Sequence, residues 1–140
     1  MAASGRELNW AAASSPTLAD IEALAWQAFD ALPAQFRDLC ADVVILVDDF
    51  ADAEALRSVG LDNELELTGL FTGVALPHQE GSSLPRLPNT VHLYRVPLLL
   101  EWAESEVTLG DLVTHVLVHE IGHHFGLSDE DIHAIEAEAD

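Results

Sequence analysis

Lysine is absent from this sequence, and cysteine and methionine occur once each, as Cys40 and Met1. The five basic residues are all arginines and stand against 25 acidic residues, so the formal net charge is −20. A field of this sign repels nucleic-acid phosphates and anionic membrane surfaces and attracts basic peptides or proteins. We therefore expect no nucleic acid and no membrane as partner, although such acidity also serves solubility alone.

A single cysteine excludes an intramolecular disulfide and a cysteine-based structural zinc site. Cys40 ends an apolar helical pattern, which predicts a packing role rather than a catalytic thiol. No apolar stretch reaches the length that spans a bilayer, and Asn9, Ser14 and Pro16 interrupt the alanines near the N-terminus before a signal region can form. We expect a soluble, cytoplasmic protein.

The pattern H-E-x-x-H is formed by His119, Glu120 and His123. On an α-helix, residues four apart lie one turn above each other, so the two imidazoles can reach one metal ion. Glu120 can then reach a water on that ion without being a ligand, as a metal-assisted hydrolase requires. Independent draws from this composition give about 0.03 matches per chain, so chance is a poor explanation.

A catalytic zinc ion usually takes three protein ligands and keeps a fourth position for water. Gly126 lies just past the expected helix end and can adopt the left-handed conformation that turns the chain back. Asp129 follows on the far side of this turn. We therefore expect Asp129 to be the third ligand, with Glu136 and His133 on the last helix as alternatives.

Two neighbouring histidines are expected to stay outside this ligand set. His115 shares a stripe with His119 and His123, but it lies about 12 Å along the axis from His123, too far for both to bind one ion. We predict that His115 packs or supports a ligand. His124 points about 100° away from His123 and is expected beside the site or at the surface.

The extended pattern H-E-x-x-H-x-x-G-x-x-D resembles the zincin metallopeptidases, in particular those whose motif ends in Asp where metzincins generally have a third His. In size and layout the chain is similar to the minimal zincin-like family of small bacterial proteins, most strongly over residues 91–135. The resemblance implies Glu120 as the general base of peptide-bond hydrolysis. It implies one Zn²⁺ per chain, held by His119, His123 and Asp129. Metzincins also place a methionine turn beneath the metal, and a chain whose only methionine is its first residue cannot be an ordinary metzincin.

By the same resemblance, an edge strand beside the metal helix should pair with an extended peptide substrate. The alternating run Val91 to Val96 is our candidate for that strand, through the unpaired backbone groups of a sheet edge. Within it, Tyr94 or Arg95 could stabilise a developing oxyanion. Each has a structural alternative, which is an interfacial aromatic residue for Tyr94 and a salt-bridge partner for Arg95.

Hydrophobic periodicity and turn residues predict the surrounding elements. Helices are expected over 17–32, 34–40, 51–59, 97–102 and 108–125, followed by a last helix capped by Ser128. Strands are expected over 43–47, 65–76 and 91–96. The first strand is a continuous apolar run of mostly β-branched residues, which indicates a central strand buried on both faces. The longest loop, 77–89, holds His78 and Glu80, which could approach the metal but are more often merely exposed.

Together these patterns predict an α+β protein with a flexible arm over residues 1–15 and a single zincin-like domain over residues 16–140. The domain is expected to be a small twisted sheet of three or four strands backed by helices, with the ligands on the C-terminal helix from Thr108 to Phe125. A zinc-dependent peptidase is the leading hypothesis. Two alternatives stay open, a metal-stabilised binding module without turnover and an acidic partner protein for basic surfaces.

Overall fold

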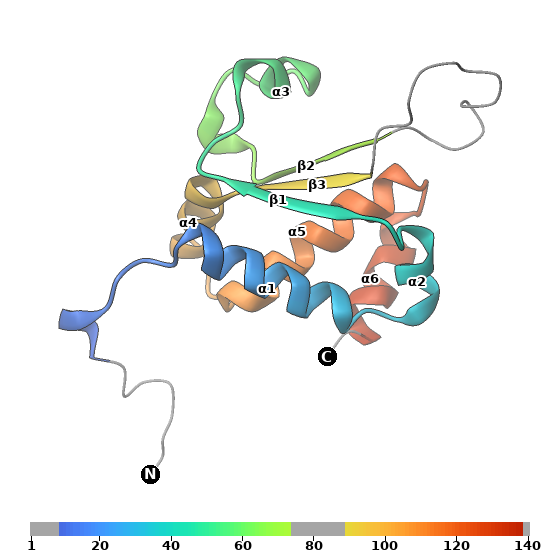
Figure 1. Ribbon diagram of the computed structural model, residues 1–140, viewed down its shortest axis with the longest axis horizontal. Coiled ribbons are helices and arrows are strands. Elements are labelled where there is room, and N and C mark those ends of the chain that lie inside the picture. The colour runs from blue at the N-terminus through green and yellow to red at the C-terminus, as the bar shows by residue number, and fades with distance from the viewer. Residues whose placement is uncertain (1–8, 74–88, 139–140) are drawn as a thin grey trace, which may run out of the picture.

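The computed structural model describes residues 9–73 and 89–138, which form a three-stranded mixed sheet with helices packed around it (Figure 1). The helices are α1 (Leu18–Asp30), α2 (Ala34–Leu39), α3 (Ala53–Ser58), α4 (Arg95–Ala103), α5 (Leu109–His124) and α6 (Asp129–Glu138). The strands are β1 (Val44–Asp48), β2 (Gly69–Thr72) and β3 (Thr90–Tyr94), and two 3-10 helices are η2 (Trp10–Ala12) and η3 (Glu64–Glu66). The predicted α+β fold with a helix near the C-terminus is confirmed.

Strand β3 lies in the middle of the sheet, whose order is β1-β3-β2. β1 runs parallel to it, with Val44 opposite Thr90, and β2 runs antiparallel, with Gly69 opposite Leu93. The prediction that the run 91–96 forms an edge strand is therefore wrong, because β3 carries a strand on each side. Within the described sheet, the edges are β1 and β2.

The apolar run of β1 is buried on one face only. Ile45 packs into the core and is 4% exposed, whereas Val44 and Leu46 on the opposite face are 37% and 47% exposed. The prediction of a central strand buried on both faces is wrong. A continuous apolar run is consistent with burial on both faces but does not reveal whether a helix covers the second one.

The main hydrophobic core lies between the sheet and helices α1 and α5, which cover the same face (Figure 1). Its fully buried side chains come from both helices and from β3, and they include Ile21, Ala25, Val91, Leu93, Val113, Leu117 and Ile121. Cys40 belongs to this core and is 1% exposed. Burial, with a smaller contribution from Asp42, raises the pKa of its thiol to about 11, so the predicted packing role of this cysteine is confirmed.

Side-chain caps define the starts of α5 and α6. Thr108 Oγ1 accepts a hydrogen bond from the Asp111 N–H at 3.1 Å, and the Asp131 N–H donates to Ser128 Oγ at 3.1 Å. Between the two helices, Gly126 has φ of +80°, the left-handed conformation that glycine adopts at little cost. The predicted extent of α5, the cap at Ser128 and the turn at Gly126 are confirmed, and the turn returns α6 along α5 (Figure 1).

Arg95 lies at the start of α4 rather than in a strand. Its guanidinium forms an ion pair with Asp49 at 3.1 Å and donates to the Pro16 carbonyl at 2.6 Å and to Ser15 Oγ at 2.8 Å. These contacts match the salt-bridge alternative that the sequence left open for this residue. They tie the segment before α1 to the domain.

Some predictions concern residues outside the described ranges. These are residues 1–8 of the expected arm, together with most of the loop and its His78 and Glu80. Within the described ranges, each helix is too short or too polar to traverse a lipid bilayer.

Candidate metal centre

Helix α5 presents His115, His119 and His123 along one side, one turn apart. The rings of His119 and His123 lie 5.4 Å apart between centroids and nearly perpendicular to each other. Asp129, in the first turn of α6, places Oδ1 3.0 Å from Nε2 of His123. One ligand atom from each of His119, His123 and Asp129 lies within 4.8 Å of the others. The structure thus brings together the three side chains that were predicted as ligands.

This donor set suits a zinc ion. Two imidazoles and a carboxylate are common zinc ligands, and bonds of about 2.0–2.2 Å in tetrahedral geometry place ligand atoms roughly 3.3 Å apart. Nε2 of His119 is buried without a hydrogen-bond partner among the described residues. The side chains of His123 and Asp129 are 54% and 87% exposed, so the group opens to solvent on their side.

The surroundings of the group favour the ligating forms of two side chains. Burial, followed by the neighbouring His115, lowers the pKa of His119, and a metal binds the neutral imidazole. A hydrogen bond from His123 lowers the pKa of the Asp129 carboxyl, which favours the ionised carboxylate. Both directions fit the requirements of a metal site.

Glu120 follows His119 on α5 and belongs to neither of the metal-ligating groups found among the described residues. Burial raises the pKa of its carboxyl, while His123 and a hydrogen bond from the Phe71 backbone act in the opposite direction. Glu120 is therefore a carboxylate beside the candidate ligands that the ligand set does not itself use. That is the position in which the sequence predicted a general base.

Gly69 allows β2 to lie close against α5. A Cβ at this position would meet Val116 Cγ1 at 2.7 Å and Glu120 Cγ at 3.4 Å. Two residues further along β2, the ring of Phe71 stacks on His124 with centroids 4.0 Å apart. This contact between β2 and the motif helix was not predicted from the sequence. An isolated glycine inside an expected strand was the available signal, because it marks a close approach of the backbone.

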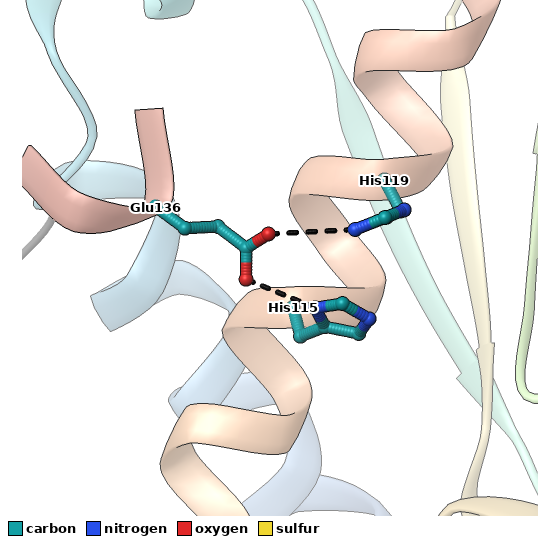
Figure 2. A group of neighbouring side chains, drawn as sticks. All are labelled: His115, His119 and Glu136. Carbon is teal, nitrogen blue, oxygen red and sulfur yellow. Dashed lines mark hydrogen bonds and ion pairs between the residues drawn. The ribbon is translucent and has the colours of Figure 1, made fainter. Parts of the chain in front are cut away.

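A second group of ligand-type side chains lies one turn before the first on α5 (Figure 2). His115 Nδ1 is 2.9 Å from Oε1 of Glu136, and His119 Nε2 is 3.4 Å from Oε2 of the same carboxylate. The sequence left Glu136 open as an alternative ligand but did not connect it with His115. The seven-residue spacing from Asp129 to Glu136 was the available signal, because it places both carboxylates on one face of α6. His133, the other alternative, belongs to neither group.

Tyr94 belongs to neither group, although the charge of Glu120 is among those that raise the pKa of its hydroxyl. It packs with Ala51 and Leu67 in a second, smaller apolar cluster and is 4% exposed. Burial, followed by the charges of nearby acids, raises the pKa of its hydroxyl to about 12, so the phenol remains protonated at neutral pH. Its role toward an oxyanion stays a prediction, and its place on a substrate-binding edge is corrected by the central position of β3.

Comparison with known protein families gives a match over most of this chain. The profile of a family described as zincin-like metallopeptidase matches residues 40–139 of the 140-residue sequence. The matched part runs from before β1 to the end of α6, so it includes the whole sheet and every side chain of both ligand groups. No curated protein matches the sequence. Because the match covers well over half of the chain, this protein belongs to the zincin-like metallopeptidase family.

Proposed function

We propose that this protein is a zinc-dependent peptidase in which Glu120 is the general base. One ion per chain would be held by His119, His123 and Asp129. The proposal is carried by the convergence of these three ligand atoms within 4.8 Å, with Glu120 on the same helix as the two histidines. When bound at such a site, zinc lowers the pKa of a water molecule and polarises the scissile carbonyl.

In the reaction, the side chain of Glu120 transfers one proton. Glu120 takes the proton from the attacking water and passes it to the amine that leaves. Burial, which raises the pKa of this carboxyl, strengthens the carboxylate as a base, and the hydrogen bond from the Phe71 backbone orients it. Strand β2 therefore supports the catalytic carboxylate from the side of the sheet.

We place the extended substrate along β2 in place of β3. Within the described sheet, β2 has β3 on one side and no strand on the other. Gly69 brings this strand against the helix that carries Glu120. A peptide that adds to an edge strand gains main-chain hydrogen bonds along its length. On this edge it would run past the candidate metal centre.

The negative net charge of the protein favours basic peptides or proteins as substrates. A net charge of −20 favours a basic peptide or protein over nucleic acid or an anionic membrane surface. We also place the protein in the cytoplasm, where a single buried thiol such as Cys40 needs no disulfide partner. Cleavage of basic peptides should weaken as salt rises, because surface charges are then screened.

Glu120→Gln tests the general base. We expect the variant to bind zinc as the parent does and to lose at least about 100-fold in kcat/KM, since general-base catalysis contributes about 10²–10⁴-fold. Zinc content is measured by elemental analysis, and hydrolysis is measured on a peptide library that is rich in arginine and lysine.

Glu101→Gln is the matched control, because this exposed glutamate on α4 loses the same charge away from the motif helix. It should leave both zinc content and kcat/KM unchanged. Full activity of Glu120→Gln would remove Glu120 from the mechanism. A zinc-loaded parent that cleaves no member of the library would instead favour the binding module.

A further inference from the structure

We propose that His115, His119 and Glu136 form a second metal position, one helical turn before the first, and that a single ion occupies either position through the shared His119. We call the set of His119, His123 and Asp129 the first position and the new set the second position. Metal binding at the second position does not depend on whether the protein hydrolyses peptides.

The contacts of Glu136 carry the proposal (Figure 2). Both oxygens of its carboxylate face histidine nitrogens, at 2.9 Å from His115 Nδ1 and 3.4 Å from His119 Nε2. One ligand atom from each of the three side chains lies within 4.8 Å of the others. The 3.4 Å separation is close to the roughly 3.3 Å between ligand atoms of a tetrahedral zinc site.

Two atoms of the second position are buried and unsatisfied. Among the described residues, neither Nε2 of His119 nor Oε2 of Glu136 has a hydrogen-bond partner. Buried polar atoms are normally hydrogen-bonded, so a nitrogen and a carboxylate oxygen that face each other at 3.4 Å without a hydrogen bond call for an explanation. A cation between them would satisfy both at once.

The second position is more enclosed than the first. The side chain of Glu136 is 21% exposed and that of Asp129 is 87% exposed. The histidine partners follow the same order, with 46% for His115 and 54% for His123. An ion in the second position would therefore be better shielded from solvent.

The two helices repeat the same arrangement along their length. On α5, His115 and His119 have the four-residue spacing of His119 and His123. On α6, Asp129 and Glu136 are two turns apart, and each completes one pair of histidines. The second position therefore follows from the packing of α6 along α5, and not from one side chain alone.

Sharing His119 makes the two positions alternatives. A neutral imidazole carries a proton on one nitrogen and has only the other free to bind a metal. His119 can therefore serve one ion at a time. We expect each chain to bind one ion that is divided between the two positions.

Zinc titration by calorimetry on the full chain tests this division. One variant combines His123→Ala with Asp129→Ala and keeps only the second position. Another combines His115→Ala with Glu136→Gln and keeps only the first position. We expect the parent and both variants to bind one equivalent of Zn²⁺, and His119→Ala to bind at least about 100-fold more weakly.

A matched pair of glutamates on α6 isolates the new ligand. Adding Glu136→Gln to the variant that keeps only the second position should weaken zinc binding at least about 100-fold. Adding Glu138→Gln, which removes the same charge from an exposed side chain, should leave the affinity within about 3-fold. Circular dichroism establishes that each variant is folded, and Asp129→Asn alone is a milder way to disable the first position.

Nuclear magnetic resonance of the histidine rings gives a second readout. In the variant that keeps only the second position, zinc should shift the ring signals of His115 and leave those of His133 unchanged. A folded variant of this kind that binds no zinc would overturn the second position and leave an ion pair between Glu136 and His115. Loss of binding in the variant that keeps only the first position would instead count against the ligands of the proposed peptidase.

Discussion

Helix α5 has two faces with different surroundings. One face packs against the sheet and α1, and its residues are at most 6% exposed, among them Leu112, Val113, Val116, Leu117 and Ile121. The other face carries three histidines whose side chains are 46%, 26% and 54% exposed. Both faces belong to the same 16 residues. The first face consists of apolar side chains that are buried on folding. The second carries side chains that can bind a metal ion.

The two faces divide folding and metal binding within one helix. The apolar face contributes the area that is removed from water on folding. The histidine face contributes side chains whose contacts are mostly with one another and with the carboxylates of α6. Substitutions on the two faces should therefore separate stability from metal affinity.

Leu117→Ala should have the largest effect on stability. Leu117 is fully buried, so its truncation leaves a cavity and lowers the free energy of unfolding by about 2–5 kcal/mol. His119→Ala on the other face should change this free energy by less than about 1 kcal/mol in the metal-free protein while weakening zinc binding at least about 100-fold. Urea unfolding followed by circular dichroism measures both. A loss above about 2 kcal/mol for His119→Ala would make the histidine face structural as well.

Gly122 lies where α5 meets α6, and its substitution should affect both properties. A Cβ there would lie 2.7 Å from Cγ1 and 2.9 Å from Cδ1 of Ile132. Gly122→Ala should therefore displace α6 and lower the free energy of unfolding by about 1–3 kcal/mol. It should also weaken zinc binding, because α6 carries Asp129 and Glu136. Urea unfolding and zinc titration test the two effects together.

Gly110→Ala is the matched control for this substitution. Gly110 lies in the first turn of α5, and no atom would lie within 4 Å of its Cβ. Alanine is favoured over glycine in a helix by about 0.5–1 kcal/mol, so this variant should be slightly more stable and bind zinc normally. Similar losses in both variants would show that the contact with Ile132 is unimportant.

The motif helix could be predicted from the sequence because its determinants are local. Thr108 caps its start, Gly126 turns the chain after its end, and the spacing of His119 and His123 defines the histidine face. Each of these features depends on residues within a few positions of one another. The placement of Asp129 beside His123 follows from the same short turn. The catalytic role of Glu120 and the metal roles of the ligands stay predictions.

The sheet order and the second ligand group could not be predicted because they depend on distant contacts. β3 pairs with β1 and β2, which are far from it in the sequence. The alternating pattern of β3 does not indicate which strand is central. Glu136 meets His115 only because α6 docks on α5, where Gly122 admits Ile132. The spacing of Asp129 and Glu136 places both carboxylates on one face of α6, but it does not show that this face docks on α5.

Gly126→Ala and Gly60→Ala should both have small effects on stability and should differ in zinc affinity. Both glycines have positive φ, +80° and +73°, and neither has an atom within 4 Å of an added Cβ. Alanine should therefore cost about 1 kcal/mol of stability at each site, from backbone strain alone. Only the turn at Gly126 leads into Asp129, so in the variant that keeps only the first position zinc affinity should fall when Gly126→Ala is added and stay unchanged when Gly60→Ala is added. Thermal unfolding of the metal-free variants and zinc titration measure the two quantities, and equal affinities would mean that this turn does not position the carboxylate.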